Sequence, residues 1–368
     1  MILNFSNLDL FEQCQHKYLL RERRRLQPPR IVTMERGVGG HAGISHFHKT
    51  GDVQAAMDVA EREVRSAMEH TMILPEEHIT WERAVVSARA GVKKYAETYS
   101  KLTYTVLRTE VRFLQPIPNT EHHCQIFHDI LEKCGRLTHE AGIVTHTGEV
   151  FDPTHSSKLC WRPHYAAGIT DAVISLNSEI WLQDHKFSGF KAEMFFRFYE
   201  LDFQGTLYCW GIQQETGITP KGFVINKIGM PTKRQMADDV DFESEPYLRN
   251  ALDYGRMLAW ATDVGNEIES RIIATEAYGF AVASREFRIN PKACYDYQRE
   301  CPYHNVCMQH DSPESLEDFE VAPPRYYDAL YYDILCREGT LTWSDVPQDI
   351  RELLHTEALK EVNSVSTT

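Results

Sequence analysis

A predicted β-hairpin in the middle of the chain constrains the fold more than any other feature. Residues 167–175 and 179–186 form two strand-like runs. Residues 176–178 between them, Leu-Asn-Ser, make a polar turn of hairpin length. We therefore expect two antiparallel strands here, and a fold that contains a sheet.

Three ionisable side chains converge on one side of this hairpin. Asp184 and Lys186 are two positions apart in the second strand, so they share a face, and His185 points away. Antiparallel pairing brings Asp171 of the first strand near Asp184. Such carboxylates suit Mg²⁺ or Mn²⁺, and a lysine beside a phosphate can orient water and offset developing charge. The residues alone leave two interpretations, a solvent-facing charged strand or a metal site.

The rest of the chain predicts helices around this sheet. Helical patterns cover residues 6–25, 35–99, 192–214 and 245–275, and strand patterns cover 103–113 and 222–226. This order suits an α/β core with helical additions better than a helical bundle or a β-sandwich. Residues 116–162 have scattered histidines and no clear periodicity.

A basic run ends the first predicted helix. Its cations are Lys17, Arg21, Arg23, Arg24 and Arg25, and a Pro-Pro pair follows. The run is either a solvated face or a phosphate contact made by Arg21 and Arg24. A net charge of −14 argues against a protein that coats nucleic acid non-specifically. It leaves room for an enzyme that holds metal ions with carboxylates and contacts DNA through a local basic patch.

Three closely spaced cysteines indicate a metal site. Six residues separate Cys294 from Cys301, and five separate Cys301 from Cys307. Soft thiolates favour zinc or an iron–sulfur cluster, and either needs a fourth ligand, for which Cys14 is the candidate.

The chain carries no signal for membrane insertion or export. No stretch approaches the roughly 20 apolar residues of a membrane span. The N-terminal residues lack a basic region followed by an apolar run and a cleavage site. We expect a cytoplasmic protein without a membrane partner.

Four motifs together resemble the RecB-like branch of the PD-(D/E)xK nucleases. The hairpin segments 168–171 and 181–186 resemble the core signature, and residues 37–41 resemble the Gly-x-x-x-His motif. Residues 204–208 resemble the Gln-x-x-x-Tyr motif, and residues 6–18, ending in Cys-x-x-Lys-Tyr, resemble the opening helix.

The resemblance implies a fold and a set of roles. The fold is a restriction-endonuclease-like core, a mixed sheet flanked by helices, with helical additions and a cluster-bearing C-terminal segment. Asp171, Asp184 and Lys186 are catalytic, and His41 completes the metal site with the two carboxylates. Gln204 and Tyr208 contact substrate. Taken alone, His41 is equally an ordinary helix histidine, and Gln204 with Tyr208 an ordinary pair four positions apart on a helix.

The resemblance also implies a cofactor. AddB-type nucleases and CRISPR adaptation exonucleases bind a [4Fe–4S] cluster through one early and three late cysteines, which here are Cys14, Cys294, Cys301 and Cys307. The commonest form has a close Cys-x-x-Cys pair, and the first gap here is longer, so zinc stays the alternative.

These expectations combine into one hypothesis. Residues 1–311 form a metal-dependent DNA nuclease domain, and residues 312–368 an extension of unknown role. The enzyme is an exonuclease that acts on DNA ends in recombination, repair or DNA processing, on substrate that is single-stranded or has a free end. The chain has no Walker motif, so any helicase activity comes from a partner helicase or recombination protein. The alternative is an inactive nuclease-fold protein that binds DNA or assembles with a helicase.

Overall fold

The computed structural model describes most of the chain and divides it into two compact units. The described residues are 1–28, 30–71, 73–101, 104–118, 137–138, 142–144, 150–151, 164–229, 240–278, 286–296, 299–317, 319–323, 332–333, 336–337 and 342–354. Unit 1 comprises Met1–Pro28, Leu114–Ala167 and Leu258–Thr368, and unit 2 comprises Pro29–Phe113 and Gly168–Met257. In the described part of the chain, no helix combines the length and the apolar character of a membrane span.

A mixed sheet forms the centre of unit 2, as the sequence predicts. Among the residues that the structure describes, the sheet has six strands, of which five are β3 (Tyr104–Pro116), β7 (Tyr165–Leu176), β8 (Glu179–Ser188), β9 (Gly222–Gly229) and β10 (Phe242–Leu248). β7 and β8 pair antiparallel, β8 and β9 parallel, and β9 and β10 antiparallel, while β3 pairs with β7. The predicted hairpin is confirmed, with Asn177 and Ser178 at φ 52° and 64° as in a type I′ turn.

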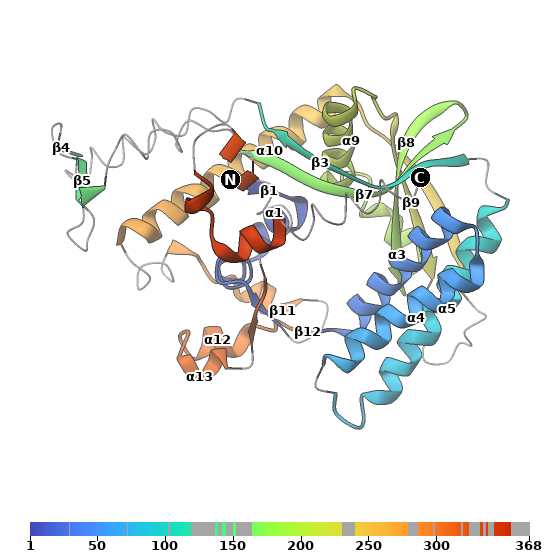
Figure 1. The fold of residues 1–368 in the computed structure, drawn as a ribbon, viewed down its shortest axis with the longest axis horizontal. Coiled ribbons are helices and arrows are strands. Elements are labelled where there is room, and N and C mark those ends of the chain that lie inside the picture. The colour runs from blue at the N-terminus through green and yellow to red at the C-terminus, as the bar shows by residue number, and fades with distance from the viewer. Residues whose placement is uncertain are drawn as a thin grey trace. The chain divides into compact units, whose positions relative to one another are not determined.

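Three mutually packed helices lie on one side of this sheet, and two of them contact its strands directly. They are α3 (Val32–Thr50), α4 (Val53–Glu69) and α5 (His78–Tyr99), which lie side by side (Figure 1). Their shared core includes Ala60, Val64 and Val92, all fully buried, and it packs against Ile228 of β9. The helical pattern predicted over residues 35–99 therefore forms three mutually packed helices, of which α3 and α5 contact the sheet.

The other face of the sheet packs against α9 (Phe203–Thr216). A side chain at Gly205 would overlap the Phe223 ring of β9, whereas Ile228 of the same strand meets Gly91 of α5. Positions 223 and 228 are an odd number apart, so they face opposite sides.

The continuous helix predicted for residues 192–214 is wrong. The structure has α8 (Ala192–Arg197), a bend, and then α9, because the Asp202 side chain accepts hydrogen bonds from the N–H groups of Gln204 and Gly205 and starts a new helix. The helix predicted over 245–275 also begins later, since residues 245–248 belong to β10.

Unit 1 consists of short elements and most of one long helix. They are β1 (Ile2–Leu3), α1 (Phe5–Gln13), α2 (Gln15–Tyr18), the π-helical turn η1 (Leu19–Arg23), β2 (Leu26–Gln27), β4 (Leu137–Thr138), β5 (Gly142–Val144), β6 (Val150–Phe151), η2 (Pro291–Cys294), β11 (Tyr295–Asp296), β12 (Arg299–Glu300), α12 (His304–Met308), α13 (Pro313–Leu316), β13 (Glu320–Val321) and η3 (Trp343–Asp345). The long helix α10 (Ala251–Tyr278) begins in unit 2 and lies mostly in unit 1.

The single helix predicted for residues 6–25 is replaced by α1, α2 and η1. Cys14 interrupts it with an extended backbone, at φ −162° and ψ 112°. Leu20 and Leu26, downstream of that break, pack with Tyr303 and Val306 in a small buried cluster, and the Tyr303 hydroxyl donates to the Leu26 carbonyl at 2.6 Å. The N-terminal segment is thereby joined to the cysteine-bearing segment of the same unit.

Two of the four glycines of helix α3 differ in surroundings and give a matched test. A Cβ at Gly39 would lie 2.7 Å from the Ala60 carbonyl oxygen, whereas nothing lies within 4 Å of one at Gly37. Because the helix backbone of α4 cannot yield locally, we expect Gly39→Ala to lower the free energy of unfolding by about 1–3 kcal/mol. Gly37→Ala should raise it by about 0.5–1 kcal/mol, since alanine favours the helix. Urea denaturation measures both, and equal effects would contradict this packing.

Candidate active site

The hairpin brings the three predicted catalytic residues together. The register pairs Ala172 with Gln183, so its continuation by one position sets Asp171 opposite Asp184. The Lys186 ammonium lies 2.8 Å from Oδ2 of Asp184, which agrees with the expected shared face. The side chains of Asp184 and Lys186 are only 15% and 26% exposed, so the group is shielded from water yet open enough to be reached.

Both oxygens of the Asp171 carboxylate have partners. His41 of α3 places Nδ1 3.1 Å from Oδ1, and the backbone N–H of His185 donates to Oδ2 at 2.7 Å. The residue that the sequence suggested as a further metal ligand, His41, therefore contacts the first carboxylate directly.

The two carboxylates differ in their electrostatic surroundings. Burial raises the pKa of Asp171, but the charge and hydrogen bond of His41 and the N–H of His185 outweigh it, so that pKa lies below its ordinary value. Burial also raises the pKa of Asp184, the nearby Asp171 raises it further, and Lys186 only partly offsets both. Asp184 is thus the carboxylate whose charge gains most from an added cation.

Lys186 keeps its proton in this setting. Burial lowers the pKa of its ammonium, but Asp184 more than compensates, so the pKa lies above the ordinary value. Lys186 is therefore a fixed cation and a hydrogen-bond donor, and it cannot serve as a base near neutral pH.

Helix α9 contributes the next contacts. The Lys186 ammonium donates to Oε1 of Gln204 at 3.1 Å, and Nε2 of Gln204 donates to the Tyr208 hydroxyl at 3.2 Å. Gln204 and Tyr208, the two residues of the predicted Gln-x-x-x-Tyr motif, therefore form a chain of hydrogen bonds that begins at Lys186.

Family comparison now decides the class of the protein. The sequence profile of the PD-(D/E)XK nuclease superfamily matches residues 2–308. The chain belongs to this superfamily. No curated protein matches it.

Among solved structures, one from Eubacterium rectale, provisionally described as an exonuclease, shares 12% sequence identity with this PD-(D/E)XK chain. The match covers 89% of this chain and 92% of that one, with a TM-score of 0.42. A likeness this weak adds no argument to the family assignment.

One residue near the site in this PD-(D/E)XK chain escaped prediction because it acts from a distant part of the sequence. Arg249, just after β10, donates to the backbone carbonyls of Tyr199, Glu200 and Asp202 at 3.0, 3.2 and 3.4 Å. Its Nε also donates to the Thr206 hydroxyl at 2.7 Å. Arg249 fixes the bend before α9 and so positions Gln204. Its sequence context has no motif that signals this role.

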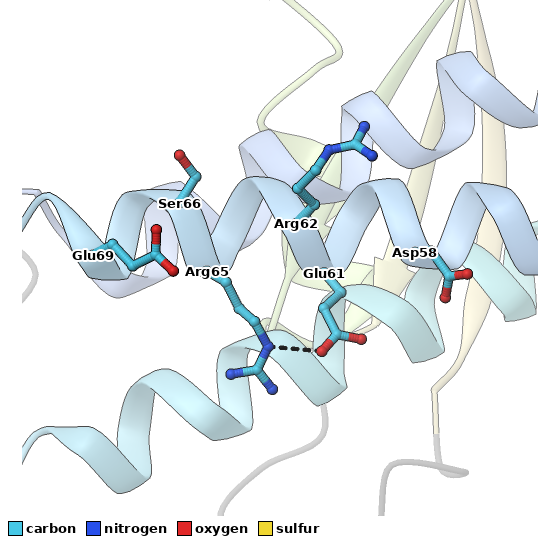
Figure 2. Close-up of a pocket in the computed structure, with 6 residues that line it drawn as sticks. All are labelled: Asp58, Glu61, Arg62, Arg65, Ser66 and Glu69. Carbon is cyan, nitrogen blue, oxygen red and sulfur yellow. Dashed lines mark hydrogen bonds and ion pairs between the residues drawn. The ribbon is translucent and has the colours of Figure 1, made fainter.

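A pocket on the exposed side of α4 is lined by five charged residues and one serine. Its lining residues are Asp58, Glu61, Arg62, Arg65, Ser66 and Glu69 (Figure 2). Arg65 pairs with Glu61 and with Glu82 of α5, and Arg89 of α5 pairs with Asp58 and Glu61. These ion pairs join two helices, so we assign them a structural role.

The four predicted cluster cysteines all lie in unit 1. The Cys301 N–H donates to the Cys294 carbonyl at 2.8 Å, and the Asn290 N–H donates to the Cys14 sulfur at 3.5 Å. Burial raises the pKa of Cys307 to about 12, and the charges of Cys14, Cys301 and Cys294 add to the shift. In the described residues, no three His, Cys, Asp or Glu side chains are arranged as a ready metal-binding group.

A buried histidine beside these thiols was also missed. The ring of His16 is 2% exposed, and its Nδ1 lies 3.2 Å from the Cys307 sulfur while Nε2 lies 3.3 Å from Asp311. Arg24, predicted as a phosphate contact, lies 3.8 Å from the same Asp311 carboxylate. Arg21 lies 3.7 Å from Glu22. Both arginines belong to unit 1, whereas the carboxylates of the hairpin belong to unit 2.

The buried His185 predicts acid sensitivity. Its ring packs against Tyr95 at 4.9 Å between centroids and accepts from Asn226 at 3.2 Å, and burial lowers its pKa to about 3. Between pH 6.5, the ordinary value, and 3, only the unfolded chain binds this proton, so stability falls as pH drops through that window. His185→Gln keeps an acceptor for Asn226 and removes the titration.

We expect the parent to lose about 2 kcal/mol more than His185→Gln between roughly pH 6.5 and pH 5. Urea denaturation at each pH isolates this difference, because acid titration of the carboxylates affects both proteins. Parallel stability curves would show that the ring titrates equally in the folded and unfolded chain.

Proposed function

We propose that this chain is a metal-dependent DNA nuclease that hydrolyses phosphodiester bonds. The observation that carries the proposal is the ion pair of Lys186 with Asp184, set opposite an Asp171 carboxylate that His41 holds. Membership of the PD-(D/E)XK nuclease superfamily supports the reaction class.

The donor chemistry of the site fits a hard divalent cation. Carboxylate oxygens are the ligands that Mg²⁺ and Mn²⁺ prefer, and the pKa of Asp184 is raised by burial and by Asp171, a cost that a cation would relieve. Asp171, Asp184 and His41 would hold the ion. When bound, it would offset phosphate charge and lower the pKa of a bound water.

Three side chains of this protein would supply the other contributions to catalysis. Lys186 stays protonated, so its ammonium would donate a hydrogen bond to the attacking water or a phosphate oxygen and stabilise developing negative charge. Gln204 and Tyr208 keep that ammonium in place through their hydrogen bonds.

We propose exonuclease action on DNA that is single-stranded or has a free end, together with a helicase or recombination partner and a cytoplasmic setting. The motif resemblance to RecB-like nucleases supports this mode. The alternative is a nuclease-fold protein that binds DNA or assembles with a helicase without cleaving DNA.

A cleavage assay with matched variants tests the catalytic proposal. We expect the parent, with Mn²⁺ or Mg²⁺, to degrade end-labelled linear single strands and to leave circular ones intact. Asp184→Asn and Lys186→Gln should each reduce the rate by about 100-fold or more, because each removes charge that acts on the reacting phosphate.

Glu179→Gln is the control for that assay. Glu179 begins the same strand and pairs with Lys221 at 2.9 Å on the surface, so cleavage should persist. Mn²⁺ should also raise the melting temperature of the parent by mass action, and raise that of Asp184→Asn much less. A metal-stabilised parent that cleaves neither substrate would favour the non-catalytic alternative.

We further propose that Cys14, Cys294, Cys301 and Cys307 bind a [4Fe–4S] cluster with a structural role, with zinc as the alternative. The hydrogen bond from the Cys301 N–H to the Cys294 carbonyl supports a shared site, as does the contact of His16, two residues after Cys14, with the Cys307 sulfur. A bound cluster would join the first helices to the segment of η2 and α12 within unit 1 and would add to its stability.

Iron and sulfide analysis with visible spectroscopy on anaerobically purified protein distinguishes the two metals. We expect a coloured protein with about four irons per chain, the content of one such cluster. Cys14→Ser should lose the colour and lower the melting temperature, while Cys336→Ser, at a cysteine outside the set, should keep both. A colourless protein with stoichiometric zinc would replace the cluster with a zinc site.

A further inference from the structure

The segment between the catalytic strand and α9 exposes an unusual set of apolar side chains. Phe190, Met194, Phe198 and Leu201 are 47%, 51%, 58% and 85% exposed. They lie on the connection from β8, which carries Asp184 and Lys186, to α9, which carries Gln204. We call this surface the α8 shelf.

Buried aromatic residues hold the shelf in place. Phe195 and Phe196 are 5% and 8% exposed, and the Tyr247 hydroxyl of β10 donates to the Phe196 carbonyl at 2.8 Å. Met194 and Phe198 are four positions apart, so they share the outer side of this turn. The exposed side chains therefore sit on an anchored element.

The shelf ends just before the helix that contacts the catalytic group. Leu201 lies three residues before Gln204, whose Oε1 accepts from the Lys186 ammonium at 3.1 Å. Arg249 donates to the Tyr199 carbonyl and to the Thr206 hydroxyl of α9, which ties this end of the shelf to the helix that carries Gln204.

The charge of the shelf indicates how it would bind. Its charged residues are two cations, Lys191 and Arg197, and three carboxylates, Glu193, Glu200 and Asp202, and Arg197 pairs with Glu193 at 3.2 Å. A surface that grips duplex phosphates needs an excess of cations. Exposed aromatic rings instead suit the open faces of unpaired bases, which a duplex keeps stacked inside.

We propose that the α8 shelf is a stacking platform for unpaired bases of a DNA strand whose phosphate lies at Asp184 and Lys186. The proposal rests on the nuclease function above and deepens it, because it selects single-stranded DNA as the form that the site receives.

Binding measurements on an inactive background test the shelf without cleavage. In Asp184→Asn, fluorescence anisotropy with a labelled mixed-sequence single strand of about 15 nucleotides and with its duplex gives both affinities. We expect Phe198→Ala and Phe190→Ala each to weaken single-strand binding about tenfold and to leave duplex binding unchanged. Phe198→Trp should retain the affinity, since an indole also stacks.

Ile218→Ala is the matched control. Ile218 is an exposed apolar residue just beyond the far end of the 14-residue α9, roughly 20 Å from Gln204 along the helix. Its removal should leave single-strand affinity unchanged.

Two results would overturn the proposal that the α8 shelf stacks unpaired bases. Unchanged single-strand affinity in both phenylalanine variants would mean that the surface serves another partner, such as a protein. Equal losses for single strand and duplex would mean that it contacts the backbone. In either case, metal-dependent cleavage by the parent would leave the nuclease proposal standing, whereas a parent that cleaves no DNA would refute that proposal separately.

Discussion

Two carboxylates and one ammonium lie close together and are largely shielded from water. Elements throughout unit 2 supply the partners that offset the cost of burying these charges. Charged groups taken out of water need partners, and losing one partner leaves the other uncompensated. Asp184 has Lys186, and Asp171 has His41 from one helical layer and a β8 N–H. Lys186 in turn reaches Gln204 on the opposite side of the sheet. The charges thereby join both helical layers to one hairpin, and the position of each layer becomes part of the geometry of the site.

The next level of support comes from two side chains that bind backbone groups. Gln204 stands at the start of α9, so its position depends on where that helix begins. Asp202 sets this start by accepting from two N–H groups, and Arg249 fixes the bend through three carbonyls. A guanidinium suits this task because its planar donors can serve several oxygens at once. The orientation of the Lys186 ammonium is thus controlled from the end of β10, far away in sequence.

Local periodicity accounts for what the sequence could predict here. Alternation along β8 is a short-range property, and it correctly placed Asp184 and Lys186 on one face. The hairpin was equally predictable, because Asn177 and Ser178 tolerate the left-handed backbone that a tight turn needs. The bend before α9 was missed because its residues also fit a helix, and the choice depends on Arg249. The contact of His16 with Cys307 joins residues from opposite ends of the chain, so spacing could not predict it.

An acidic enzyme must hold a polyanion without help from its overall charge. At a net charge of −14, long-range attraction to DNA is unfavourable, and affinity has to arise from local contacts. The proposed metal site would cancel the repulsion where it is strongest, at the two carboxylates, and the α8 shelf would add binding that does not depend on phosphate charge. Stacking releases few counterions, so affinity obtained this way falls only weakly with salt. Because this binding depends on stacking and not on phosphate charge, the α8 shelf would bind duplex DNA weakly, since a duplex exposes its phosphates and keeps its bases inside.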